Sequence, residues 1–208
     1  MRSNSIFLIL FLVFFCSCFE NEEVIGENND PGFFIPPTIP ESPFVMVLGI
    51  AQDAGFPQAG CTKECCKEAW DDHSIRRFVS CLAIIDPISK QRWILDATPD
   101  FPDQLHMLDS LCPYGELDGI FLTHAHMGHY TGLLHLGREV MNAKKVPVYV
   151  NPDMSEFLQS NKPWTQLITL ENIDLQPIKY DSIVKLNERI SVQAFLVPHR
   201  AEFTETYG

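Results

Sequence analysis

The feature that most constrains the fold is the run Ile120–Leu134, IFLTHAHMGHYTGLL, in which an apolar stretch leads into three closely spaced histidines. His124 and His126 follow the predicted strand Leu117–Leu122 at a spacing of two, so in extended chain both rings project to the same side. His129 comes three residues later, where the chain is predicted to enter a helix and the ring can turn back. Polar ligands at the exposed end of a buried strand are typical of α/β folds.

Neutral imidazoles held close together are ligands that Zn²⁺, Fe²⁺ and Mn²⁺ accept. The alternative is a set of ordinary histidines that form hydrogen bonds within a loop. A single histidine would fit that alternative, whereas the spacing His-x-His-x-x-His at a strand end favours a metal. The sequence therefore predicts a metal site formed by His124, His126 and His129.

Apolar runs and periodicities elsewhere in the chain predict strands that interleave with helices, which indicates a mixed α/β class. We predict strands over Phe44–Leu48, Cys81–Asp86, Arg92–Asp96, Leu117–Leu122, Val146–Val150, Ile168–Leu170, Ile173–Ile178 and Ile190–Val197. We predict helices over Phe101–Leu111, Thr131–Ala143 and Pro152–Gln159.

The N-terminus has the pattern of an export signal. Residues 1–17 carry one charge, Arg2, and the ten-residue apolar run Ile6–Phe15, which fits the core of a signal peptide but is too short to span a bilayer. Cys18 follows a small residue and is predicted to be lipidated after cleavage; an ordinary cleaved signal is the alternative. Residues 18–42 are polar and proline-rich and read as a tether, with one domain over 43–208. We expect a lipid-anchored protein on the periplasmic or cell-surface side of a bacterial membrane.

The charge balance argues against a nucleic-acid partner. The net charge is −12 at pH 7, and such a surface repels phosphate backbones. The expected partners are a small-molecule substrate and, through Cys18, the membrane; the oligomeric state is not predicted.

Two segments carry a resemblance to a known family. The run THAHMGHYTGL resembles the His-x-His-x-Asp-His signature of the metallo-β-lactamase superfamily. The wider pair VLGIAQDAGFPQAGC and LTHAHMGHYTGLLHLGREV is similar to the branch grouped with pyrroloquinoline quinone biosynthesis protein B. The resemblance implies an αββα sandwich whose first metal is held by His124, His126 and a later histidine, for which His199 is the candidate. It also implies that Asp96 supports the histidine loop from behind the metal; a turn or helix cap is the alternative role.

Gly128 departs from the family signature, which has an aspartate at that place as a ligand of a second metal. Glycine offers no ligand, so the resemblance implies one firmly bound ion, zinc or else iron or manganese, with any second ion near His129 held weakly. A base and positioning group must then come from elsewhere. Asp53, in the loop after the first strand, is a candidate, although an ordinary turn residue is the alternative.

The family also continues past the segment around His199. The resemblance therefore implies a C-terminally incomplete sandwich, and we expect the 208 residues to be a fragment, or a truncated relative, that lacks a complete active site. Glu202 and Glu205 are the acids that follow His199, and both are expected to be solvated.

Three further cysteines, Cys61, Cys65 and Cys66, resemble the cysteine cluster of the same branch, which implies a structural zinc. A closed tetrahedral site needs a fourth donor, such as His73 or Cys81. A disulfide from Cys61 to Cys65 or Cys66 is the alternative, because an exported protein meets oxidising conditions.

Three function classes remain open on the sequence. The first is a hydrolase in which a metal-activated water attacks a small ester, lactone, amide or phosphoester. The second is an iron oxygenase of the kind that the quinone-biosynthesis resemblance implies. The third is a non-catalytic lipoprotein that holds a metal or binds a partner. We favour the hydrolase, active when full length.

Overall fold

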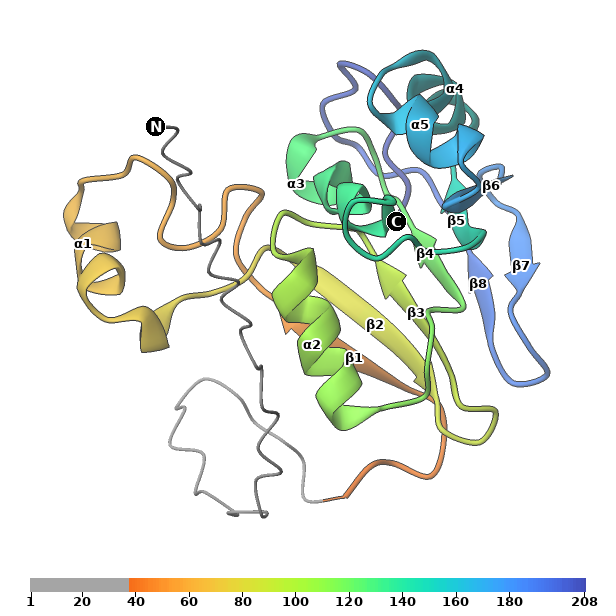
Figure 1. Ribbon diagram of the computed structural model, residues 1–208, viewed down its shortest axis with the longest axis horizontal. Helices are drawn as coiled ribbons and strands as arrows, with labels where there is room; N and C mark the ends of the chain where they lie inside the picture. Colours follow the sequence, from red (N-terminus) through yellow and green to blue (C-terminus); the bar gives the residue numbers. More distant parts are fainter. Residues whose placement is uncertain (1–37) are drawn as a thin grey trace, which may run out of the picture. The chain divides into compact units, whose positions relative to one another are not determined.

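The computed structural model describes residues 38–208, and its mixed α/β architecture around a central sheet confirms the predicted class (Figure 1). The predicted signal peptide 1–17, the lipidation site Cys18 and most of the tether 18–42 lie outside the described residues. Within residues 38–208, no helix is both long enough and apolar enough to cross a membrane.

Six strands form one sheet whose order in space follows the order in sequence. The first three strands are antiparallel, and β3 to β6 are parallel to one another. Parallel strands need crossover connections, and helices supply them here. The strands are β1 (Phe44–Gly49), β2 (Cys81–Asp86), β3 (Gln91–Leu95), β4 (Gly119–Phe121), β5 (Val146–Val150) and β6 (Ile173–Pro177).

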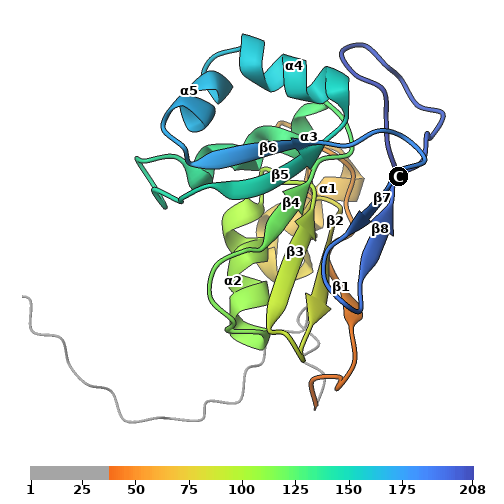
Figure 2. The ribbon, with the colours of Figure 1, turned by 90° about the vertical axis from the view of Figure 1, so that its right-hand side faces the viewer.

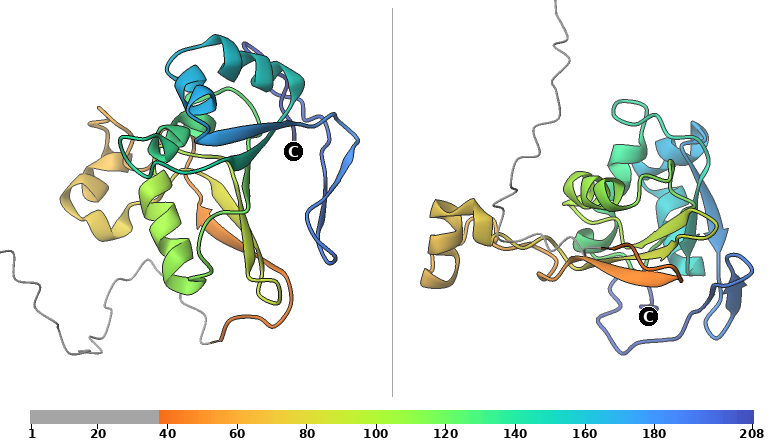
Figure 3. Two further views of the ribbon diagram at one scale, coloured as in Figure 1. Left: turned by 45° about the vertical axis from the view of Figure 1, so that its right-hand side comes forward. Right: turned by 90° about the horizontal axis from the view of Figure 1, so that it is seen from below.

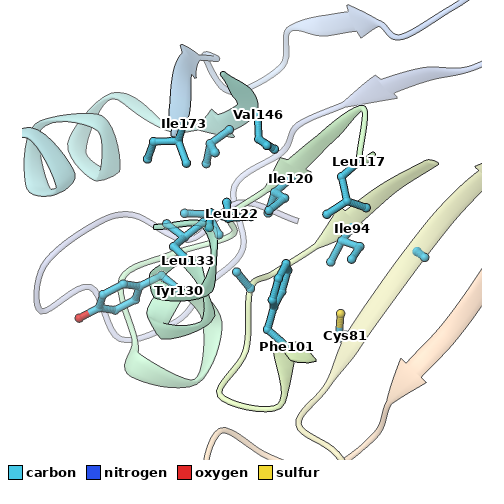
Figure 4. Close-up of a cluster of buried hydrophobic side chains, with 14 of the residues drawn as sticks. Cys81, Ile94, Phe101, Leu117, Ile120, Leu122, Tyr130, Leu133, Val146 and Ile173 are labelled. Atoms are coloured by element: carbon cyan, nitrogen blue, oxygen red, sulfur yellow. The ribbon is translucent and has the colours of Figure 1, made fainter. Parts of the chain in front are cut away.

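The helices pack on one face of this sheet and bury a single core (Figure 2). They are α2 (Phe101–Leu111), α3 (Met127–Tyr130), the 3₁₀ helix η2 (Thr131–Leu136), α4 (Pro152–Ser160) and α5 (Trp164–Thr169). Figure 4 shows Ile94 of β3 and Ile120 of β4 facing Phe101 and Leu133, and all four side chains are fully buried. The carboxyl ends of the parallel strands, where the histidines follow β4, are thereby anchored to a close-packed interior.

The opposite face of the sheet is less covered. Val45 and Val47, on the outward face of β1, are more than half exposed. A separate two-stranded ribbon, β7 (Ile183–Lys185) and β8 (Ser191–Gln193), is attached through its turn, where Arg189 Nε donates to the buried Asp86 carboxylate over 2.8 Å.

Residues 50–79 form an excursion between β1 and β2 that carries α1 (Glu64–Asp71) and the short 3₁₀ helix η1 (His73–Ile75) (Figure 3). Two bridges close its base, from Ala51 to Val79 and from Phe56 to Arg77. Asp53 and the cysteine cluster both belong to this excursion, but Asp53 lies near its base.

Three local predictions were wrong. Ile168–Leu170 is no strand, because Trp164 and Leu167 are buried at a helical spacing of three and the segment forms α5. The helix predicted over Thr131–Ala143 stops at Leu136, where Gly137 takes an extended conformation. The strand predicted over Ile190–Val197 is only Ser191–Gln193.

Candidate metal centre

The histidine loop is built on the end of β4 and fixed to the end of β3. Asp96 follows β3 and its N–H donates to Phe121 O over 2.7 Å, while Ala97 N–H donates to His129 O over 2.9 Å. β4 ends at Phe121, the chain bends at residues 125 and 126, and α3 begins at Met127 after His126, whose backbone is extended. The strand end therefore holds His124 and His126 against the core, as the period-two spacing predicts.

Three histidine nitrogens converge on one point. His124 Nε2 lies 2.9 Å from His126 Nδ1, and His199 Nε2 lies 3.2 Å from the same Nδ1. The three ligand atoms are all within 4.8 Å of one another. Ligands about 2.0–2.1 Å from a tetrahedral ion are separated by about 3.3 Å, so the donor set fits a divalent cation. His199, 73 residues beyond His126, comes from the loop after β8.

The His124 ring is held in the form that a metal requires. Burial, together with repulsion from His129, His126 and His199, lowers the pKa of His124 to about 4, so the ring is neutral at pH 7. The Thr123 hydroxyl lies 3.0 Å from both carboxylate oxygens of Asp96 and 2.9 Å from His124 Nδ1. Because its single proton goes to Asp96, Thr123 Oγ1 accepts from Nδ1–H, and the Nε2 lone pair is left free.

Glu202 fixes the position of the proton on the His126 ring. Its Oε2 lies 2.8 Å from His126 Nε2, so this nitrogen donates outward and Nδ1 faces the other histidines. This hydrogen bond lowers the pKa of the Glu202 carboxyl, and Arg200 Nη1 lies 3.3 Å from its other oxygen. The expectation that Glu202 is merely solvated was wrong. No local sequence signal marks it, because 76 residues separate it from its partner.

His129 is placed beside the three-histidine group, between two carboxylates. Its Nδ1 lies 2.7 Å from Asp96 Oδ2, and its Nε2 lies 3.2 Å from Asp53 Oδ1. Burial works to lower the pKa of His129, but the two carboxylates outweigh it and the pKa is raised. For Asp53 the two directions are reversed. Burial raises the pKa of Asp53, but the attraction to His129 outweighs it and brings the pKa below its usual value. The structure thus brings Asp53, Asp96 and His129 together as one row.

Asp96 is the centre of this arrangement. Its Oδ1 also accepts from the Thr123 N–H over 2.8 Å, so one carboxylate holds both the Thr123–His124 pair and His129. Its φ of 68° lies in the left-handed region that favours glycine, which is a strained conformation for a residue with a side chain. Strain of this kind at a functional position is offset by the hydrogen bonds that fix the carboxylate.

A second group of donors lies in the excursion. The sulfurs of Cys61, Cys65 and Cys66 are within 4.8 Å of one another, and the Cys65 and Cys66 sulfurs are 4.0 Å apart. All five cysteines between residues 38 and 208 are free thiols. Cys81 does not join the group: it is buried at the start of β2, with its thiol 3.5 Å from Asp96 O.

Comparisons with known proteins agree with this geometry. Residues 91–208, more than half of the chain, match the family described as beta-lactamase superfamily domain. The chain is 30% identical over 116 residues to an octanoyltransferase from Porphyromonas gingivalis, a match that covers 55% of this chain and 22% of that protein. It is 30% identical over 128 residues to coenzyme PQQ synthesis protein B from Klebsiella pneumoniae, covering 58% of this chain and 40% of the relative.

Among solved structures, Zn²⁺-bound PqqB from Methylobacterium extorquens superposes with a TM-score of 0.61 at 24% identity. The superposition covers 74% of this chain and 52% of that one, and it shows the shared fold. The chain spans less than half the length of the two curated relatives.

Proposed function

The chain belongs to the metallo-β-lactamase superfamily, in the branch similar to PqqB, and from this premise we propose that it is a metal-dependent hydrolase. Its substrate would be a small ester, lactone, amide or phosphoester. The observation that carries the proposal is the convergence of the nitrogens of His124, His126 and His199. A divalent cation held there would supply a Lewis acid and would lower the pKa of a water in its coordination sphere to about 7.

The surrounding residues prepare this site by fixing rings and proton positions. Thr123, held by Asp96, keeps the proton of His124 on Nδ1. Glu202 keeps the proton of His126 on Nε2. Each ring therefore presents a lone pair to the centre without having to reorient, which is the kind of support that ligating histidines need.

The test is a metal and activity comparison on the purified full-length gene product that contains these 208 residues. We expect the protein loaded with zinc, iron(II) or manganese(II) to hydrolyse at least one of a panel of p-nitrophenyl ester, lactone, amide and phosphodiester substrates. His199→Ala should lose both the tightly held ion and the turnover, whereas His106→Ala, which removes an exposed histidine on α2, should keep both. Metal-loaded protein that turns over none of these substrates, or equal turnover in both variants, would contradict the proposal.

An oxidative function is the second candidate, and the observation that favours it is the 30% identity to a relative named coenzyme PQQ synthesis protein B. Metal preference separates the two candidates: zinc at the site favours hydrolysis, whereas iron and O₂ consumption favour oxidation. A protein that binds metal tightly but turns over no substrate would instead support a metal-holding or partner-binding module.

We also propose that the protein is exported and lipid-anchored through Cys18 on the periplasmic or cell-surface side of a bacterial membrane. The support is the apolar run Ile6–Phe15 followed by a cysteine behind a small residue. In cells fed a labelled fatty acid, the protein should carry the label and sediment with membranes. Cys18→Ala should lose both properties, and Cys16→Ala should lose neither; label that persists in Cys18→Ala would refute the anchor.

A further inference from the structure

Gly128, in α3, lies directly against the backbone of Asp53. A Cβ at position 128 would lie 2.6 Å from both the Cα and the Cβ of Asp53 and 2.8 Å from its carbonyl oxygen. Its φ lies outside the left-handed range, so the close approach, and not the backbone conformation, is what requires glycine. Because main-chain atoms cannot turn away as a side-chain tip can, any larger residue would displace the loop that carries Asp53.

The close approach of Gly128 and the Asp53 backbone places the Asp53 carboxylate beside the His129 ring. Asp53 Oδ1 lies 3.2 Å from His129 Nε2, while Asp96 Oδ2 lies 2.7 Å from Nδ1. A neutral imidazole has one N–H and can donate to only one of these carboxylates. With the N–H directed at Asp96, the Nε2 lone pair would face a carboxylate oxygen, which is repulsive unless a positive charge lies between them. That charge is either a proton or a metal cation.

We propose that Asp53 Oδ1 and His129 Nε2 are ligands of a second divalent cation beside the three-histidine position, and that Gly128 makes room for Asp53 to reach it. The proposal rests on the metal centre proposed above. Ligands about 2.1 Å from one ion lie about 3.0 Å apart in octahedral and about 3.4 Å apart in tetrahedral geometry, and the observed 3.2 Å falls between these values. A mixed nitrogen and oxygen pair suits zinc, manganese or iron.

Three further points favour a metal over a proton. A histidine whose Nδ1 donates to a carboxylate while its Nε2 faces outward is the usual arrangement of a supported metal ligand. The ring centroid of His129 lies 4.2 Å from that of His124, so the two positions are neighbours. The Asp53 side chain is 50% exposed, which leaves room for water as the remaining ligands. With two protein donors, this second ion should be held more weakly than the first.

Calorimetric titration with Zn²⁺, checked by elemental analysis, tests the proposal. The metal-free parent protein carries Cys61→Ser and Cys65→Ser, so that the cysteine cluster adds no zinc site of its own. We expect two classes of binding, one tight and one weaker. Asp53→Asn should weaken the second class at least tenfold and leave the tight class in place. Asp71→Asn removes the same charge from an exposed position of α1 in the same excursion, and should change neither class.

Gly128→Ala gives an independent arm, because its Cβ displaces Asp53 without removing a ligand atom. It should also lose the weaker class, with circular dichroism reporting whether the fold is kept; if Gly128→Ala does not fold, Asp53→Asn decides alone. A parent protein with only the tight class, or a second class that Asp53→Asn leaves unchanged, would overturn this inference but not the three-histidine centre. Absence of the tight class itself would overturn both.

Discussion

The histidine centre and the cysteine cluster make an informative comparison, because each brings three metal-type donors within 4.8 Å of one another. At the histidine centre, the outer nitrogens of two rings are held by Thr123 and Glu202. At the cysteine cluster, Cys65 is exposed and Cys61 half-buried, and the contact between the Cys65 and Cys66 sulfurs is between neighbours in the chain. The donor atoms are therefore equally close together in the two clusters. The clusters differ in the hydrogen bonds that hold the donor side chains in place.

The difference follows from where each cluster lies. His124 and His126 follow β4 on a loop attached to the ends of β3 and β4, so their positions are fixed by the core that Figure 4 shows, and His199 comes from the loop after β8. The cysteines lie in and just before α1, in an excursion closed at its base by two isolated bridges. A site on a packed sheet keeps its geometry without a ligand, whereas a site on an excursion depends more on the ligand for its order.

Thiol labelling should show the largest contrast between the two regions. Burial raises the pKa of Cys81 and of Cys112, whereas a backbone hydrogen bond at Lys63 lowers that of Cys61. In reduced protein, a thiol reagent should modify Cys61 and Cys65 about a thousandfold or more faster than Cys81 and Cys112, because the buried pair reacts only on unfolding. Mass spectrometry of timed samples measures the rates.

Since a thiolate is the reactive form and its fraction rises with pH, the lowered pKa means that Cys61 should reach full reactivity at a lower pH than an ordinary thiol. Added zinc that blocks the labelling of Cys61 and Cys65 would favour the structural-zinc interpretation over a disulfide. Comparable labelling of Cys81 and Cys65 in folded protein would show that the start of β2 is not buried in a packed core.

The second contrast is in stability. Phe101 is fully buried in the core beneath η2, so Phe101→Ala should lower the free energy of unfolding by about 3–5 kcal/mol through lost burial and a cavity. Trp70, on α1, is 47% exposed, and Trp70→Ala should lower it by less than about 1 kcal/mol. Urea denaturation followed by circular dichroism measures both. Equal losses would mean that the excursion is as much a part of the core as the sheet is.

The sequence predicted what local patterns encode. Apolar runs located β1, β2 and β3, and the His-x-His spacing located two of the three converging histidines, because both depend on neighbours in the chain. Glu202 could not be found in this way, since its contact with His126 depends on how the C-terminal segment passes the end of β4. The gap at Gly128 was visible as a missing side chain, but that Asp53 fills the space follows only from the packing of the excursion. The short run Ile168–Leu170 was wrongly predicted as a strand, because three residues are too few to distinguish a helical spacing from a strand spacing.

Removal of the support behind His124 is expected to have an intermediate effect. Thr123→Val keeps the shape of the side chain but removes the hydroxyl that accepts from His124 Nδ1. We expect zinc affinity at the histidine centre to fall about 10–100-fold, as it does when groups that orient a ligating histidine are lost. Thr131→Val is the matched control, because its hydroxyl bonds to Met127 O on the surface of α3. Competition with a chromogenic chelator measures the affinity, and equal values for both variants would contradict the role of Thr123.

The smallest effect should come from Glu202→Gln. The Glu202 side chain is 45% exposed, so water screens its interaction and can replace it as an acceptor for His126 Nε2–H. Glutamine keeps an oxygen that can accept the same hydrogen bond, and loses only the charge. We therefore expect zinc affinity to fall by less than about tenfold, against the larger loss in Thr123→Val, where the His124 ring and the Asp96 carboxylate on either side of the hydroxyl are buried. If Glu202→Gln instead weakened zinc binding as much as Thr123→Val, burial would not explain why one hydrogen bond to a histidine ring matters more than another. The contrast between the histidine and cysteine clusters would then have to rest on the charge of the supporting group.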